Sequence, residues 1–232
     1  MKKILLVVFL LLTSPAQALN LTNAVNSLER EWAAVYYNDA GAKSSARYQA
    51  LLSEANMLAK QFPDKPEPIL WQAIITASGA DSLPPIEALV EITHARDLLI
   101  KVIEIAPDGV NGSALVTLGT MYYMAPAWPV SFGDNEKAKE LLTKALKLNP
   151  DNIEANYFYG DFLLNQNQPE EAAAYFKKAL NAPIRKNQQF ADKSLQQQAS
   201  LALANAQERK LNGSKKIFLS FFNSSENASE NH

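Results

Sequence analysis

Two stretches of eleven residues, Glu136–Leu146 (EKAKELLTKAL) and Glu170–Leu180 (EEAAAYFKKAL), lie 34 residues apart and match position by position. Ala138 aligns with Ala172, and the other small and apolar residues of the two stretches recur at the same spacing. Residues spaced in this way share one face of a helix. A period of this length predicts a helix–turn–helix unit that buries its apolar face only by stacking on its neighbours. The pair therefore predicts an all-α chain built from stacked helical hairpins.

The residues before each stretch complete the unit. A first helix precedes it, with Gly119 in one unit and Gly160 in the next. This period, with Gly119 paired to Ala138 and Gly160 to Ala172, resembles the tetratricopeptide repeat. The resemblance implies that the glycine of the first helix faces the alanine of the second, so that the two backbones approach closely. Pro150 is expected to end the second helix of the first of these two units, because a proline cannot continue a helix.

Earlier parts of the chain fit the same plan less regularly. A hairpin is expected from Leu21–Asn38 with Ala42–Phe62, which Gly41 and Pro63 terminate. A further first helix fits Pro68–Ser78, and its second helix fits Ile86–Ala106. The predicted architecture is a superhelical array of about four antiparallel hairpins.

The period stops after Pro183, and a terminal cap is expected there. Residues 187–211 are predicted to form a helix whose Gln- and Asn-rich side faces solvent, as the end of a solenoid requires. Its apolar side would hold Phe190, Leu195, Ala199, Ala202, Leu203 and Ala206. The helical-repeat domain, with this cap, is therefore predicted over residues 19–211. A mostly polar, mobile tail is expected over residues 212–232.

The first eighteen residues have the pattern of a secretory signal peptide. Lys2 and Lys3 precede the apolar run Ile4–Leu12, and the small-residue pattern Ala16–Ala18 follows. This order predicts cleavage after Ala18. The apolar run is too short for a membrane-spanning helix, which needs about 20 residues. A periplasmic protein with no integral membrane segment after cleavage is expected.

The composition excludes several classes of function. The chain has no cysteine and two histidines, so thiolate and multi-histidine metal sites are excluded. A net charge of −2 gives no electrostatic reason to bind nucleic acid. No Ser–His–Asp set, pair of catalytic carboxylates or phosphate loop can be recognised. A non-enzymatic protein without a cofactor is therefore expected.

The family architecture implies that the first helices line a concave face, which would bind a partner. The expected contact residues on it are Thr120, Tyr123 and Met124 in one unit and Tyr157, Asp161 and Asn165 in the next. The alternative is that some of them pack the groove or cover the C-terminal helix. Trp128 and Phe132 lie in an insert between the two helices of one unit. That insert could plug the groove, form a ligand rim, make a subunit contact or be a packed loop.

The insert carries a second resemblance. The stretch Tyr122–Asp134 (YYMAPAWPVSFGD) is similar to the periplasmic T component of TRAP transporters and its relatives. That resemblance implies a cup of cryptic repeats that associates with a substrate-binding protein and holds an apolar ligand. The leading interpretation is a periplasmic binding or adaptor protein that takes a protein segment, a peptide or a small apolar ligand on its concave face. An accessory T-type transport component is the alternative, and a homo-oligomer is left open.

Overall fold

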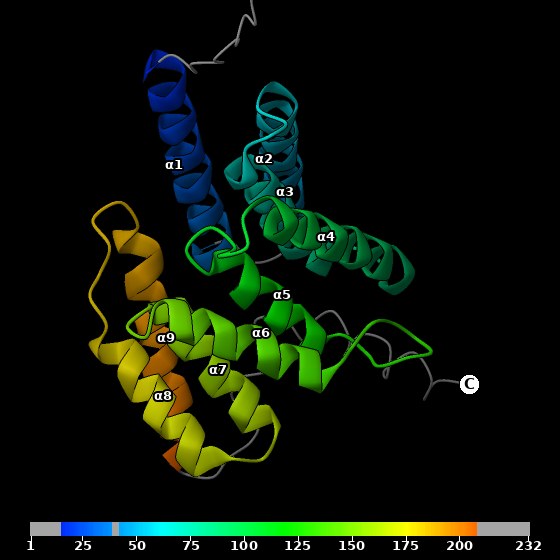
Figure 1. Ribbon diagram of the computed structural model, residues 1–232. Coiled ribbons are helices and arrows are strands. Elements are labelled where there is room, and N and C mark those ends of the chain that lie inside the picture. The colour runs from blue at the N-terminus through cyan, green and yellow to red at the C-terminus, as the bar shows by residue number, and fades with distance from the viewer. Residues whose placement is uncertain (1–14, 39–41, 208–232) are drawn as a thin grey trace, which may run out of the picture.

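The computed structural model describes residues 15–38 and 42–207, which form nine α-helices and one short 3₁₀ turn (Figure 1). The helices α1 to α8 pair into four hairpins, and α9 packs against the last of them. No strand occurs within these described ranges, so the predicted all-α class and hairpin number are confirmed. The elements are α1 Pro15–Asn38, α2 Ala42–Gln61, α3 Pro66–Gly79, η1 Ala80–Ser82, α4 Pro85–Ile105, α5 Ser113–Met124, α6 Asn135–Leu148, α7 Ile153–Asn165, α8 Pro169–Asn181 and α9 Gln189–Gln207.

The two ends of the chain fall largely outside this description. Residues 1–14 of the predicted signal peptide and the whole predicted tail, residues 212–232, lie outside the described residues. Helix α1 begins at Pro15, ahead of the predicted cleavage point after Ala18. No helix in the described part of the chain is long and apolar enough to cross a membrane.

Local sequence explains where the repeat helices begin. The carboxylate of Asp134 accepts hydrogen bonds from the backbone nitrogens of Glu136 and Lys137, at 3.0 and 3.1 Å. The side chain of Asn152 accepts one from the nitrogen of Ala155 at 2.8 Å. Each cap satisfies amide groups that have no partner inside the helix. These caps fix the starts of α6 and α7.

Within the two clear hairpins the helix backbones are in close contact. A Cβ atom added at Gly119 would lie 2.8 Å from Cγ of Leu142, and one added at Gly160 would lie 2.9 Å from the ring of Phe176. The carbonyl oxygens of Ala138 and Ala172 also lie within 3.3 Å of those positions. The predicted pairing of glycine with alanine is therefore confirmed. It allows Leu142 and Phe176, both fully buried, to fill the space between helices.

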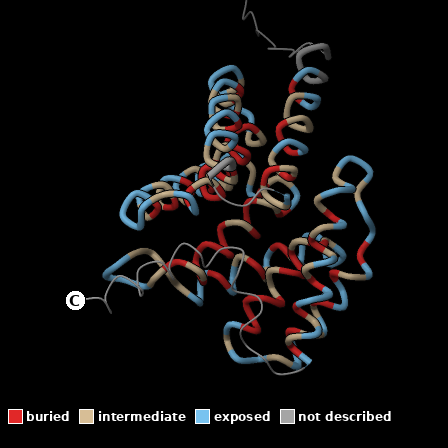
Figure 2. The backbone as a smooth tube through the Cα atoms, turned by 180° about the vertical axis from the view of Figure 1, so that it is seen from behind, coloured by how far each residue is buried: buried red, intermediate tan, exposed pale blue. Residues whose placement is uncertain are grey.

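The apolar core follows the superhelix (Figure 2). One continuous cluster of buried side chains extends from α3 to α9. A second, smaller cluster joins α1, α2 and α3, with Leu28, Val35, Leu51 and Ile75 among its members. Because α3 contributes to both clusters, the irregular first hairpin is packed onto the regular repeats.

Helix α9 covers the last hairpin, but its faces differ from the prediction in two respects. Leu195, Ala199, Ala202 and Ala206 are buried as expected, whereas Phe190 is 46% exposed. Phe190 comes in the first turn of α9. Its ring reaches only the edge of the Tyr37 ring, with centroids 6.1 Å apart.

The polar face of α9 does not simply face solvent, which corrects the second expectation. The side-chain amide of Gln196 donates to the carbonyl oxygens of Leu180 and Ala182 at 3.1 and 3.0 Å. These carbonyls lie at the end of α8 and lack partners inside that helix. Gln198, on the same helix, lines a cavity. Part of the glutamine-rich face therefore has a structural role.

Candidate functional site

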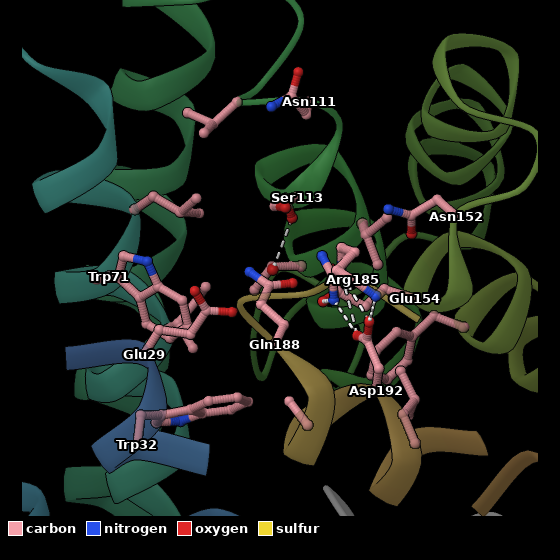
Figure 3. A pocket seen from close by; sticks show the side chains of 18 of the residues that line it. Glu29, Trp32, Trp71, Asn111, Ser113, Asn152, Glu154, Arg185, Gln188 and Asp192 are labelled. Carbon is pink, nitrogen blue, oxygen red and sulfur yellow. Dashed lines mark hydrogen bonds and ion pairs between the residues drawn. The ribbon is translucent and has the colours of Figure 1, made fainter. Parts of the chain in front are cut away.

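A cavity of about 630 Å³ lies along the face formed by the first helices of the four hairpins (Figure 3). Its walls come from α1, α3, α5 and α7, from the connections that lead into α5, α7 and α9, and from α9 itself. Among the second helices of the hairpins only α6 contributes, through Leu148 at its end. The expectation that the first helices line the concave face therefore agrees with this geometry. Helix α9 forms the remaining wall, which the repeat pattern did not predict.

One wall of the cavity holds a partly buried ion-pair network. The guanidinium of Arg185 lies 2.7 Å from Glu154 and 2.5 Å from Asp192. The backbone nitrogen of Arg185 also donates to Asp192 at 2.7 Å. Asp192 is 1% exposed. Burial alone would lower the pKa of Arg185, but the charge of Glu154 and the hydrogen bond to Asp192 raise it above its ordinary value. This network joins α7 to the start of α9.

A second carboxyl group faces this network from α1. Glu29 is 7% exposed, and burial raises its pKa to about 7. A hydrogen bond with Gln188 and the charge of Arg185 act in the opposite direction, while Glu154 and Asp192 raise the pKa further. In Figure 3, Glu29 lies on the side of Trp71, with Gln188 between it and the Arg185 network. The cavity therefore contains a carboxyl group that changes its charge near neutral pH.

Aromatic rings form the opposite wall. Trp32 of α1 and Trp71 of α3 have ring centroids 5.5 Å apart. The indole nitrogen of Trp32 donates to the hydroxyl of Ser78 at 3.0 Å, which fixes the ring. Tyr36 and Tyr37 also line the cavity, and burial raises the pKa of both hydroxyls, so they stay neutral. One side of the site thus holds the aromatic rings together with Glu29, and the other holds the ion pairs of Arg185.

Three of the six residues expected on the concave face lie deeper than expected. Thr120 lines the cavity, but Tyr123, Tyr157 and Asp161 are buried among the helices and are not part of its lining. The hydroxyl of Tyr123 donates to Asp161 at 2.6 Å, and burial followed by the charge of Asp161 raises the pKa of Tyr123. The Tyr157 ring packs on Phe176 within its own hairpin. These positions match the packing alternative, and a binding role for them stays a prediction.

The other expected residues are dispersed. Met124 is half-buried at the end of α5, and Asn165 is exposed at the end of α7. In the insert, Phe132 packs edge-on against Tyr122, and the guanidinium of Arg96 lies 4.8 Å from its ring centre. Trp128, in contrast, is 86% exposed. The insert is therefore packed at Phe132 and open at Trp128, and neither residue lines the cavity.

Sequence reasoning did not identify the charged part of this site. Glu29 and Arg185 are 156 positions apart in the chain, and Gln188 lies at the start of the segment that was expected only to cap the array. A period of 34 residues gives no information about contacts between the first and last helices. The one available signal was an arginine and an aspartate near the start of a predicted cap, Arg185 and Asp192. Within the described residues, no group of three or more His, Cys, Asp or Glu side chains is arranged to hold a metal ion.

Comparison with known proteins supports the repeat assignment over part of the chain. Residues 130–183, which include α6, α7 and α8, match the tetratricopeptide repeat family. The solved structure "MamA MSR-1 C2" is 18% identical, and the alignment covers 92% of this chain and 99% of that one with a TM-score of 0.43. At that TM-score the likeness carries no argument about this chain. No curated protein matches, and neither similarity is to the T component of TRAP transporters.

Proposed function

We propose that this chain is a non-enzymatic adaptor that holds a segment of a partner protein in the cavity between its first helices and α9. One observation carries this proposal: the cavity of about 630 Å³ is lined by helices from every hairpin of the array. Helical-repeat proteins use their concave surfaces for binding. Specific ligand sites commonly measure about 300–1,000 Å³. The match of residues 130–183 to the tetratricopeptide repeat family supports the same conclusion.

Site-specific photo-crosslinking tests where the partner binds. A photo-reactive residue in place of Gln198, which lines the cavity, should crosslink one partner protein in cells. The same residue in place of Ala204, which is exposed on the same helix, is the matched control and should not. Ala191→Trp should abolish the crosslink, because the larger side chain would fill part of the cavity that Ala191 and Gln198 both line. Equal crosslinking from both positions, or a crosslink unaffected by Ala191→Trp, would refute the proposal.

The proposal includes export to the periplasm. The lysine pair, the apolar run and the Ala16–Ala18 pattern support cleavage after Ala18. All residues that line the cavity come after this position, so cleavage would leave the site whole. The mature protein would begin at Leu19. N-terminal sequencing of the protein from a periplasmic fraction tests this, and an intact Met1 on soluble cytoplasmic protein would contradict it.

An accessory T-type role in a transport system is the narrower candidate. It is supported by the stretch Tyr122–Asp134, which contains the exposed Trp128 and the packed Phe132. In this case a substrate-binding protein would co-purify with the chain, and Trp128→Ala would weaken the complex. A partner of any other kind, captured from the cavity with Trp128→Ala unchanged in binding, would exclude this candidate.

A further inference from the structure

The charge of the cavity lining is strongly unbalanced. Its carboxyl groups come from five separate segments of the chain, and they are Glu29, Glu67, Asp108, Glu154 and Asp192. Arg185 is the cation of the lining among the described residues. With all groups ionised, the formal charge of the lining is −4. A cavity of this charge favours a cationic ligand, because placing an anion there would add like-charge repulsion to the cost of desolvation.

The single arginine is not available for an anionic ligand. Its guanidinium already contacts both Glu154 and Asp192, at 2.7 and 2.5 Å. Glu29, Glu67 and Asp108 form no ion pair with any described residue. When ionised, these three carboxyl groups therefore carry three of the four negative charges of the lining, and the group of Arg185, Glu154 and Asp192 carries the fourth.

Two residues of the cavity lining carry buried side-chain oxygens that have no hydrogen-bond partner. These oxygens are Oε2 of Glu67 and Oε1 of Gln188. An ionised carboxylate oxygen and an amide oxygen are acceptors only. Because buried acceptors are normally satisfied, these atoms indicate a ligand that donates hydrogen bonds.

The aromatic wall provides the remaining chemistry. Trp32 and Trp71 lie near Glu29 in Figure 3, and their rings are 5.5 Å apart. The faces of such rings attract cations and cover alkyl groups. Leu70 and Ile74 of α3 extend the same apolar wall. The wall is thus suited to a hydrocarbon chain that ends in a positive charge.

We propose that the cavity binds a primary ammonium group on an alkyl chain, with the ammonium donating to the unpartnered oxygens and the chain packing on the tryptophan wall. This inference rests on the proposed function, because it specifies the ligand of the same cavity. A lysine side chain of a partner protein and a free alkyl diamine share this chemistry. Either source would neutralise part of the charge of the lining and satisfy its acceptors.

Tryptophan fluorescence of the purified full chain provides the test. The chain has three tryptophans, so Trp128→Phe removes the exposed one and leaves Trp32 and Trp71 in the cavity as reporters. The probes are cadaverine, with glutarate and 1-pentanol as anionic and neutral controls of the same chain length. Acetyl-Gly-Lys-Gly-amide and its norleucine analogue form a second pair. We expect cadaverine or the lysine peptide to bind at least about tenfold more tightly than its controls, as for hydrogen bonds to a charged group.

A second substitution, made in the Trp128→Phe chain, tests whether the amine binds in the cavity. Glu67→Gln should weaken amine binding roughly tenfold, whereas Glu136→Gln, exposed on α6 outside the cavity, should not. Circular dichroism of both variants confirms that they fold. Glutarate or 1-pentanol binding as tightly as cadaverine, or unchanged binding in folded Glu67→Gln, would overturn the inference.

The outcome also separates this inference from the proposed function. If Gln198 crosslinks a partner protein but no amine probe binds, the adaptor proposal stands and the amine inference fails. If cadaverine binds and the lysine peptide does not, the source is a free amine. If an amine binds and no protein is crosslinked, the adaptor proposal fails while the ligand class stands.

Discussion

The buried carboxyl of Glu29 makes the stability of the fold depend on pH in a defined direction. Burial raises its pKa from 4.5 to about 7. Between these values the unfolded chain is ionised at this position while the folded chain retains the proton. The contribution of the neutral carboxyl is therefore complete below about pH 4.5 and is lost as the pH rises through about 7.

The size of the change in stability follows from the pKa shift of Glu29. One pKa unit corresponds to about 1.4 kcal/mol, so the free energy of unfolding should fall by about 3 kcal/mol across this range. Glu29→Gln keeps a similar shape beside Gln188 and cannot ionise, so it should abolish this fall. The residue is 7% exposed, and screening by solvent therefore reduces the effect only slightly.

Urea denaturation at a series of pH values from 4.5 to 8.5 measures the difference between the wild-type chain and Glu29→Gln. Contributions from titrating groups that do not interact with Glu29 cancel in that difference. The stability of the variant relative to wild type should rise by about 3 kcal/mol as the pH increases. The exposed position Glu136→Gln is the matched control and should follow the wild-type curve. A difference that is constant with pH, or one that changes in the opposite direction, would refute the argument.

Three further substitutions test the packing and the polar contacts by denaturant unfolding. Ala172→Leu should cost about 1–3 kcal/mol, because the fully buried alanine faces the backbone of the preceding helix, whereas the exposed Ala174→Leu should change stability by less than about 0.5 kcal/mol. Arg185→Met should lower the free energy of unfolding by about 3 kcal/mol. This is the lower end of the range for breaking a buried ion pair, because part of the arginine side chain is exposed. The exposed neighbour Lys186→Met is its control, and equal losses would contradict the role of the network. Tyr123→Phe should cost about 1–3 kcal/mol by leaving its carboxylate partner on α7 without that hydrogen bond, and an unchanged denaturation midpoint would show that the bond contributes nothing.

The residues expected to bind show where the sequence pattern loses its information. A helical period places Tyr123 and Tyr157 on corresponding faces of successive first helices, and the structure agrees with that placement. The helical period does not determine how closely α5 and α7 approach each other. In the structure these helices lie near enough for Tyr123 to reach Asp161 at 2.6 Å, so the rings are covered by neighbouring helices. Thr120, one turn earlier than Tyr123, remains in the cavity lining.

The sequence by itself determined the helices and the hairpins, because those depend on interactions between residues close in the chain. Pro150, the cap Asp134 and the pairing of Gly160 with Ala172 act over one or two helical turns or across one short connection. Only the tertiary structure determined the composition of the cavity. Glu29 of α1 meets Gln188 before α9 because the superhelix brings its first and last helices together, and that curvature is the sum of small rotations at every hairpin interface. No single stretch of sequence encodes such a sum.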